Sequence, residues 1–525
     1  MPSRPTPPRI PLLLLASAAL GCGDAALPTA AAPAAPNLNV SGAATCVVTS
    51  TADAGAGSLR AMIADAACST ITFDLPLPAT IELSSGELVI ARDVTIIGPS
   101  DDWVTVDAKA LSRVLFVFSG NAAITRLTFT GGQATSGSTL TGAGITYFGN
   151  LTLTDSRVTG NYANGDGGGL AGFGTLVLDN TVVSGNAAAG AGGGVYGQSN
   201  NPITLINSTV SGNSAGSGGG ISTGGPLTII GSTVANNAAG FGGGLELGSE
   251  ATLIRSTVSG NAGGGIQASD LLTLTQSTVT ANTGSGVTGT RGTWIAGTRS
   301  IVAGNLGAPD IEFADMDATY SLIGTSQYAP TGFGSVAGVT AEQLQLGPLA
   351  NNGGPTQTHA LLAGSIAIDA IAIGVAGCGD AGSTDQRGIS RPQGPGCDIG
   401  AFEVEVAAPT FDFSGFLGPV VAAPGVNVVK AGRAIPIRFS LAGDQGLAIL
   451  DGVPTSRQIA CNLAEGTSAV EETATAGTST LTYDAATDQY SYIWKTEKGW
   501  TGSCREFALA LSDGTTHSAQ FQFTK

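Results

Sequence analysis

The segments PLTIIGSTVANN, at residues 226–237, and TLIRSTVSGN, at residues 252–261, are two copies of a unit that recurs along the middle of the chain. Each copy ends in an asparagine, and successive asparagines are separated by 25, 27, 24, 24, 21 and 23 residues. The column comprises Asn161, Asn186, Asn213, Asn237, Asn261, Asn282 and Asn305. A valine stands three residues before each asparagine, and a serine or threonine stands two residues before each valine. A repeat of this length is the signature of a solenoid.

The composition of the repeat indicates strands rather than helices. Thr, Val, Leu and Ile alternate with period two, as they do in half-buried strands. The valine and hydroxyl columns are two residues apart and therefore point the same way, inward, while the residues between them, such as Thr233, point out. Five coils also carry a glycine triplet, which lets the backbone turn sharply between short strands. The triplets lie at residues 167–169, 192–194, 218–220, 242–244 and 263–265.

We therefore predict an all-β chain dominated by a parallel β-helix. Stacked valines would form its narrow core, and each asparagine side chain would hydrogen-bond the turn of the next coil. Residues from about 75 to 335 give room for roughly 10 or 11 coils, a rod on the order of 50 Å long at ~4.8 Å per strand.

The repeat resembles known families. Its GGGI-like and V-x-x-N elements resemble the GGAI and FxxN repeats of chlamydial polymorphic outer-membrane proteins and bacterial adhesins, with Val158, Val210 or Val258 in place of Phe. More broadly, it is similar to the right-handed, pectin-lyase-like β-helix superfamily. The expectation of a right-handed β-helix comes from that resemblance.

The N-terminus predicts export. Arg4 and Arg9 precede an apolar run of signal-peptide length that closes with Ala-Leu-Gly-Cys at residues 19–22 and resembles a bacterial lipobox. Residues 1–22 would then be a lipoprotein signal peptide, and acyl chains on Cys22 would anchor the protein in a membrane. Gly23 after the cysteine resembles an outer-membrane sorting signal, so we expect a lipoprotein of the bacterial outer membrane or cell surface. The alternative is an ordinary secretory signal and a secreted protein.

Seven cysteines fit this interpretation. Without Cys22 six remain, and they fall into three neighbouring pairs that we expect to form disulfides in an oxidising compartment. The pairs are Cys46 with Cys68, Cys378 with Cys397, and Cys461 with Cys504.

Other segments define the remaining domains. Residues 23–44 are rich in Ala, Pro and Thr and predict a tether. Residues 45–345 would form an N-terminal cap and the β-helix. In the cap, Ser58 is a candidate N-cap for a short helix over Leu59–Ala67, and Ser58-Leu59-Arg60 resembles the SLR core of CSLREA-type β-helix proteins, from which Met62 departs.

Two modules are expected after the last coil. Residues 346–405, with LGPLANNGGPTQTHALLAGSIAIDA and CGDAGSTDQRGISRPQGPGCDIGAFE, resemble the choice-of-anchor Q module, which generally terminates bacterial surface β-helices. Residues 406–525 contain several short alternating strands and a tight-turn Asp513-Gly514, which predict a small Ig-like β-sandwich. This domain resembles the bacterial PxKF domain, with Pro436-Ile437-Arg438-Phe439 at the motif.

Composition limits the partners. Charged residues make up 11% of the chain and the net charge is −17, so we expect no attraction to nucleic acid or to anionic lipid. The expected partners are the membrane, through the acyl chains of Cys22, and extracellular glycans or surface polymers. We expect a monomer without a cofactor.

Polysaccharide cleavage would need grouped carboxylates on neighbouring coils. Alignment on the asparagine column places Asp155 and Asp179 in different columns, and no outward column stacks two carboxylates on adjacent coils. Acids at the corners, such as Asp166 and Glu246, fall outside this alignment. We therefore predict no catalytic residue.

Weaker constellations remain. Asp310, Glu312, Asp315 and Asp317 could supply oxygens to Ca²⁺, although a solvated acidic loop is the favoured interpretation. An acidic and basic group in the terminal module could clamp a substrate, but ion pairs that brace the module are favoured; its members are Asp385, Arg387, Arg391, Asp398 and Glu403.

These observations lead to one hypothesis and one rival. The hypothesis is a non-enzymatic, lipid-anchored cell-surface β-helix protein for adhesion, carbohydrate binding or surface structure. The rival is a polysaccharide lyase or glycoside hydrolase of the pectin-lyase-like superfamily, since a fold alone does not define a function.

Overall fold

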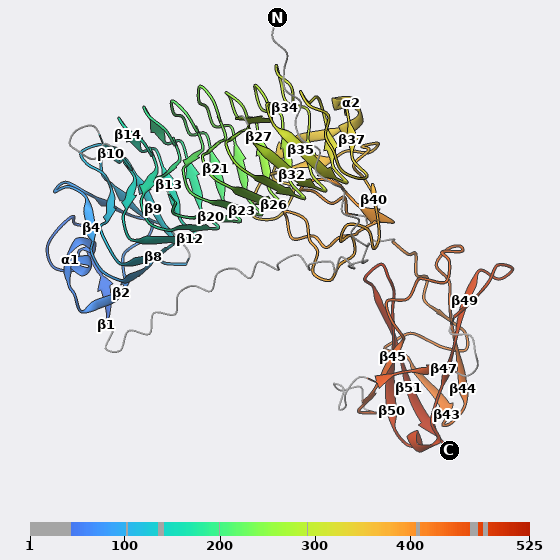
Figure 1. Cartoon of the computed structure of the whole chain (residues 1–525). Helices are drawn as coiled ribbons and strands as arrows, with labels where there is room; N and C mark the ends of the chain where they lie inside the picture. Colours follow the sequence, from blue (N-terminus) through green and yellow to red (C-terminus); the bar gives the residue numbers. More distant parts are fainter. Residues whose placement is uncertain are drawn as a thin grey trace, which may run out of the picture. The chain divides into compact units, whose positions relative to one another are not determined.

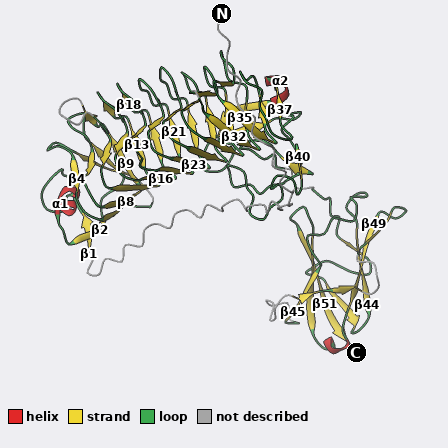
Figure 2. Ribbon diagram, in the orientation of Figure 1, coloured by secondary structure: helices red, strands yellow, loops and turns green. Residues whose placement is uncertain are grey.

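The computed structural model describes residues 44–100, 103–134, 141–198, 200–290, 292–405, 410–461, 471–475 and 481–525. The chain separates into two compact units, Met1–Val404 and Glu405–Lys525. Strands dominate both units, and helices are short (Figure 2). The expected signal peptide, the tether up to residue 43 and Cys22 lie outside the described residues.

The first unit is a parallel β-solenoid with three long sheets, which we name A, B and C. Figure 1 shows the strands of sheet A following one another along the solenoid from β8 to β35. Sheet A contains β1 (Ala44–Val48), β2 (Cys68–Phe73), β5 (Val94–Ile97), β8 (Asn121–Thr125), β12 (Asn150–Thr154), β16 (Leu176–Asp179), β20 (Ile203–Ile206), β23 (Leu227–Ile230), β26 (Ala251–Ile254), β29 (Leu272–Thr275), β32 (Trp294–Thr298) and β35 (Asp315–Thr319).

Sheet B contains β4 (Leu88–Ile90), β7 (Leu115–Val117), β11 (Ile145–Tyr147), β15 (Leu170–Gly172), β19 (Val195–Gly197), β22 (Ile221–Thr223), β25 (Leu245–Leu247), β28 (Ile266–Ala268), β31 (Val287–Gly289) and β34 (Ile311–Glu312). Sheet C contains β3 (Ala79–Glu82), β6 (Val104–Asp107), β9 (Leu127–Thr130), β13 (Arg157–Thr159), β17 (Val182–Ser184), β21 (Thr209–Ser211), β24 (Thr233–Ala235), β27 (Thr257–Ser259), β30 (Thr278–Thr280), β33 (Ile301–Val302), β36 (Leu322–Ile323) and β37 (Val336–Ala337). A short sheet of β10 (Gln133–Ala134), β14 (Tyr162–Ala163) and β18 (Ala187–Ala188) lies at one corner.

The solenoid begins earlier than the repeat pattern indicated. Strand β1 already pairs with β2 in sheet A, so the first coil starts near residue 44 rather than 75. Helix α1 (Leu59–Ala64) lies between them and ends three residues before the predicted Ala67. The side chain of Ser58 accepts a hydrogen bond from the Ala61 backbone N–H, as an N-cap does.

The predicted inward columns are buried. All seven column valines have no exposed surface, and the seven hydroxyl residues, from Ser156 to Ser300, are at most 1% exposed. Each hydroxyl oxygen accepts a hydrogen bond from a backbone N–H of the preceding coil, for example Ser208 from Thr181 at 3.0 Å and Ser232 from Ser208 at 2.9 Å. The core therefore combines an apolar stack with a hydrogen-bonded polar stack.

The asparagines form a second ladder. The Oδ1 of Asn237 accepts from the backbone N–H and the Nδ2 of Asn213, both at 2.9 Å. The Nδ2 of Asn237 donates to the Val210 carbonyl and to Asn261 Oδ1, both at 3.0 Å. The same pattern repeats from Asn161 to Asn305.

The glycine triplets have two functions in the structure. The first glycine adopts a left-handed conformation that favours glycine, as at Gly218, where φ is +55°. The third approaches the ladder so closely that a Cβ on Gly220 would lie 3.0 Å from the Nδ2 of Asn237. The triplets therefore make the turn and also leave room for the asparagine ladder.

Residues 341–404 continue the first unit as a terminal module. It contains α2 (Ala341–Leu344), β38 (Leu346–Ala350), β39 (Thr358–Leu361), β40 (Ile371–Ala372) and β41 (Gly396–Cys397). The module covers the outer face of sheet C, where Gln386 Nε2 and the Gln357 carbonyl hydrogen-bond the hydroxyl of Thr233 at 2.9 and 2.6 Å. The expectation that Thr233 is solvent-facing is wrong, because this module buries it completely.

The second unit is a β-sandwich of two five-stranded sheets. One sheet contains β42 (Phe416–Leu417), β44 (Ala434–Phe439), β49 (Gln489–Lys495), β47 (Ala474–Thr475) and β48 (Thr482–Asp484). The other contains β43 (Val426–Lys430), β51 (Thr516–Thr524), β50 (Cys504–Ala510), β45 (Thr455–Ile459) and β46 (Glu471–Glu472). Tyr490, Tyr492 and Trp494 alternate into its core, and Asp513-Gly514 lies in the hairpin between β50 and β51.

Disulfides join the three neighbouring pairs Cys46–Cys68, Cys378–Cys397 and Cys461–Cys504. Each bridge lies within one unit. In the part of the chain that the structure describes, no helix combines the length and the apolar character needed to cross a membrane.

Candidate functional site

The outer face of sheet B carries the most distinctive surface of the solenoid. In each three-residue strand the first and third residues point into the core, and the middle residue points away from it. The middle residues of successive strands therefore form one column in register. The column runs through Phe116, Thr146, Ala171, Tyr196, Ser222, Glu246, Gln267, Thr288 and Glu312. It changes from aromatic and small residues on the early coils to polar and acidic residues on the later coils.

A second column lies beside the first and begins with three phenylalanines. Phe118, Phe148 and Phe173 each follow a sheet B strand directly, and they are 55%, 40% and 44% exposed. The rings of Phe148 and Phe173 meet edge to face with centroids 4.9 Å apart, and Phe116 contacts Phe148 in the same way at 5.2 Å. Stacking of the coils therefore builds a solvent-exposed aromatic strip, which we name the phenylalanine column.

Acidic side chains occupy the later part of the same face. Glu246 Oε2 accepts hydrogen bonds from the hydroxyls of Ser217 and Ser222, at 2.7 and 2.8 Å. Burial raises the pKa of Tyr196, and the nearby charges of Asp166 and Glu246 raise it further. We expected Glu246 to lie at a corner, and that expectation is wrong: Glu246 belongs to β25 and pairs in register within sheet B. The face therefore carries aromatic rings on its early coils and carboxylates on its later coils, in two neighbouring columns.

A second carboxylate group lies at the corner between sheets A and C. Asp179 ends β16, and its backbone carbonyl accepts from the Asp155 N–H of the preceding coil at 3.0 Å. Burial raises the pKa of Asp179, and the charge of Asp155 raises it further. Asn180 Nδ2 donates to Asp155 Oδ1 at 2.6 Å. The two acids do occupy different columns, but those columns are adjacent, so the corner brings them together in a way that a column-by-column alignment does not reveal.

The structure distributes the four calcium candidates over different elements. Asp310 is buried: its Oδ1 accepts from the backbone N–H and Nδ2 of Asn305, and its Oδ2 accepts from the N–H and hydroxyl of Thr325. Glu312 lies on sheet B, where it accepts from Ser285, while Asp315 and Asp317 are exposed on sheet A. Asp310 is thus the end of the asparagine ladder, not a member of a solvated acidic loop.

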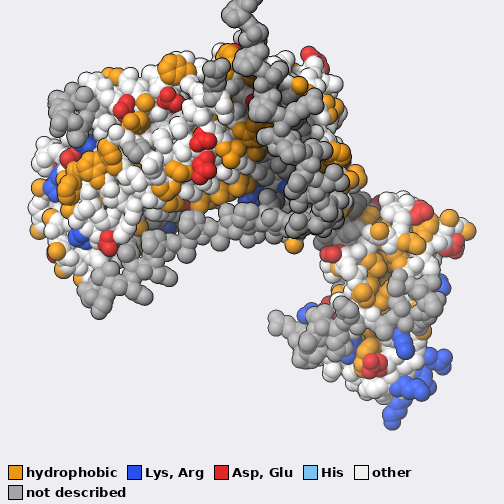
Figure 3. Space-filling view, in the orientation of Figure 1, with side chains coloured by type: hydrophobic (Ala, Val, Ile, Leu, Met, Phe, Trp, Pro, Cys, Tyr) orange, Lys and Arg blue, Asp and Glu red, His pale blue; other side chains and the backbone are white. Residues whose placement is uncertain are grey.

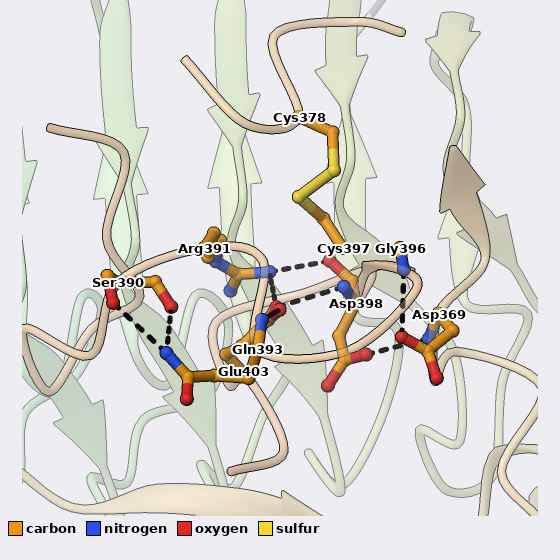
Figure 4. Close-up of a disulfide and its surroundings, with 9 residues drawn as sticks. All are labelled: Asp369, Cys378, Ser390, Arg391, Gln393, Gly396, Cys397, Asp398 and Glu403. Atoms are coloured by element: carbon orange, nitrogen blue, oxygen red, sulfur yellow. Dashed lines mark hydrogen bonds and ion pairs between the residues drawn. A yellow bond between two sulfur atoms is a disulfide. The ribbon is translucent and has the colours of Figure 1, made fainter. Parts of the chain in front are cut away.

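The charged residues of the terminal module form a buried network around Cys378–Cys397 (Figure 4). Arg391 pairs with Glu403 at 3.0 Å and donates to the Asp398 carbonyl at 2.6 Å. Burial lowers the pKa of Arg391 and raises the pKa values of Asp398 and Glu403. The backbone N–H of Asp398 also donates to the Glu403 carboxylate. The backbone N–H groups of Asp369 and Val404 donate to the Asp398 carboxylate.

The remaining pair of this network is Asp385 and Arg387, at 2.8 Å, and the Arg387 guanidinium lies 3.7 Å above the ring of Phe402. These side chains form hydrogen bonds with one another and with the backbone of the module. The arrangement favours bracing of the module over binding of a substrate.

Two members of the phenylalanine column have a regular spacing in the sequence. Phe148 and Phe173 each stand 13 residues before a ladder asparagine, Asn161 and Asn186. Phe118 belongs to a coil without a ladder asparagine, and its place becomes clear only from strand pairing.

Residues 140–306 match the family model described as right handed beta helix region. The solenoid is a right-handed β-helix. This match supports the coarser expectation of a pectin-lyase-like fold, and it covers the coils that carry the asparagine ladder. No curated protein and no solved structure matches the chain.

Proposed function

We propose that this chain is an exported, lipid-anchored surface protein whose β-helix binds an extended polysaccharide along the outer face of sheet B without cleaving it. The observation that carries this proposal is the phenylalanine column, Phe118, Phe148 and Phe173. Exposed apolar strips rimmed by polar side chains mark binding surfaces on soluble proteins.

The geometry of the column favours a sugar polymer. A pyranose ring has an apolar face of C–H groups that can pack on an aromatic ring, and its hydroxyls need polar partners at the rim. The rings repeat at the strand spacing of about 4.8 Å along the solenoid axis. Their strip therefore runs parallel to that axis and is open at both ends, as an extended polymer requires. Glu246 and Gln267, farther along the same face, supply hydrogen-bond partners for hydroxyl groups.

The sequence supports the location. The signal-like N-terminus with Cys22, the CSLREA-like start, the choice-of-anchor Q-like module and the PxKF-like domain all resemble parts of bacterial surface proteins. The expected partners are the membrane, through acyl chains, and a surface or extracellular glycan.

The binding proposal is tested with soluble Cys22→Ser protein on neutral polysaccharides, by affinity electrophoresis and a glycan array. Replacing Phe118, Phe148 and Phe173 together by Ser should abolish the retardation that the parent protein shows. Phe333→Ser, a change at an exposed phenylalanine whose ring contacts Tyr320 after β35 of sheet A, is the control. Equal retardation of the triple variant and the parent would overturn the proposal.

The anchor is tested separately by metabolic labelling with palmitate. The parent protein should carry the label and fractionate with membranes, whereas Cys22→Ser should be unlabelled and soluble. Label that persists in Cys22→Ser would show that the cysteine is not the acylated residue.

The second candidate function is polysaccharide cleavage, and the Asp155–Asp179 pair favours it. Two carboxyl groups on either side of the scissile bond are the arrangement that glycoside hydrolases use. A screen for new reducing ends or unsaturated products would reveal such an activity. Cleavage that disappears in Asp179→Asn, with binding retained, would replace the non-enzymatic proposal.

A further inference from the structure

The β-sandwich separates its charges along the strands. Five exposed cations gather at one end, where β43, β49 and β51 finish: Lys430, Arg433, Lys495, Lys498 and Lys525. Lys430 pairs in register with Thr524, the residue before Lys525, and Ala434, next to Arg433, pairs with Lys495. A Cβ on Gly432 would lie 2.5 Å from Lys498 Cγ, so this lysine packs beside the β43–β44 turn. We name this group the basic end.

The basic end is visible in Figure 3 as the blue side chains near the C-terminus marked in Figure 1. Glu497 directly precedes Lys498 and is an acidic residue beside the basic end. No carboxylate of the described chain lies within ion-pair distance of Lys430, Lys495 or Lys498.

Aspartates gather at the opposite end of the same strands. Asp488 immediately precedes β49 and accepts from Ser440, which follows β44. Asp513 lies in the β50–β51 hairpin and accepts from the Phe411 N–H near the start of the unit. Side-chain hydrogen bonds from Thr487, Ser440 and Thr515 lower the pKa values of Asp484, Asp488 and Asp513, respectively, which keeps this end anionic.

This separation is unexpected for the composition. The chain carries a net charge of −17 and has only five lysines, at positions 109, 430, 495, 498 and 525. Four of the five are in the basic end. The net charge predicts repulsion of anions, whereas the local field at this end attracts them.

We infer that the basic end is a docking surface for an acidic polysaccharide. Four of its five cations are lysines, which act as compact point charges without the forked geometry that selects a single phosphate or carboxylate. Several such charges at a convex end suit a polymer whose negative charges recur along its length. Trp500, half-buried beside Lys498 and in contact with Trp494, offers an aromatic edge for a sugar ring.

This site is distinct from the sheet B face in position and in chemistry, since the basic end needs the anionic groups of its partner and the phenylalanine column does not. Binding here should weaken steeply as salt rises, because exposed charges are screened within about 8 Å at physiological ionic strength.

The test uses the full soluble chain with Cys22→Ser and two matched probes, alginate and its uncharged propylene-glycol ester. Alginate should bind and the ester should bind at least ten times more weakly. Replacing Lys495 and Lys498 together by Gln should weaken alginate binding at least tenfold. The control removes two cations of the same unit that lie outside the basic end, Arg438 near the far end of β44 and Arg457 in the middle of β45, and should change affinity less than twofold.

Each other outcome overturns the inference. Equal losses in the two double variants would mean that only net charge matters, and an unchanged Lys495/Lys498 variant would mean that the basic end does not bind. Tighter binding to phosphatidylglycerol vesicles or to DNA, with the same sensitivity to Lys495 and Lys498, would assign the surface to another class of partner. The triple phenylalanine variant should keep the charge-dependent binding, so this result is independent of the proposed sheet B function.

Discussion

Replacing Asn237 by Ala removes one rung from the middle of the asparagine ladder. Four hydrogen bonds disappear, two accepted by Oδ1 from Asn213 and two donated by Nδ2 to Val210 and Asn261. Asn213 and Asn237 are each 1% exposed, so water does not replace the lost partners.

The cost follows from the groups left without partners. Asn261 Oδ1 keeps its bond from the backbone N–H of residue 237, and Asn213 Nδ2 keeps one bond to the Val183 carbonyl. The Asn213 backbone N–H and its second amide N–H lose their acceptor. At about 1–3 kcal/mol for each buried orphan donor, the variant should lose about 2–6 kcal/mol of unfolding free energy.

The assay is urea denaturation of residues 44–404, monitored by circular dichroism. This fragment is the compact first unit, which has its own core and two disulfides. Thr228→Ala, at a half-exposed outward position on β23, is the control and should cost less than about 0.5 kcal/mol. Asn237→Asp should cost at least as much as Asn237→Ala, because one carboxylate oxygen would face the oxygens of Val210 and Asn261. An Asn237→Ala variant as stable as Thr228→Ala would refute the ladder argument.

Three further outcomes are expected. Val234→Asp and Thr233→Asp should each destabilise the first unit by several kcal/mol in urea unfolding, because both side chains are fully buried, whereas Thr209→Asp, half-exposed on the neighbouring coil, should cost less than about 1 kcal/mol; equal costs at Thr209 and Thr233 would contradict the position of the terminal module. Asp310→Asn should lower the unfolding free energy by about 1–3 kcal/mol in the same assay, since the amide N–H groups would face the donors from which Asp310 now accepts hydrogen bonds. An unchanged unfolding free energy would contradict the role of Asp310 at the end of the ladder. Burial lowers the pKa of His359, opposed by its hydrogen bond to the Gly347 carbonyl, so the unfolded chain takes up the proton first and unfolding free energy should fall as pH drops below about 6.5; the same loss in His359→Gln would assign the pH dependence to other groups.

The solenoid could be predicted from the sequence because each coil repeats the environment of its neighbour. Spacing alone therefore placed the valine, hydroxyl and asparagine columns on the inside. The contacts of the terminal module depend on residues more than 100 positions away, as between Thr233 and Gln357. Thr209 and Thr233 have the same repeat position but different exposure, and no local pattern distinguishes them.

The candidate sites were predicted less completely for related reasons. Asp310 lies in a turn outside the repeat register, so its place at the end of the ladder depends on where the last coils lie. The Asp155–Asp179 pair depends on a corner at which two columns meet. The phenylalanine column and the basic end each combine residues from separate segments, which become neighbours only when the strands pair.

The asparagine ladder also has a consequence for how such a protein changes in length. Each rung accepts from the rung before it and donates to the rung after it, so every internal coil presents the same two bonding surfaces. A duplicated coil inserted between Asn213 and Asn237, for example, would find both surfaces already complementary, and the differences in repeat length would be taken up in the loops. Asp310 closes the series, since its two oxygens accept and cannot pass the pattern on. Gene duplication and deletion can therefore lengthen or shorten the rod one coil at a time while its two ends stay the same.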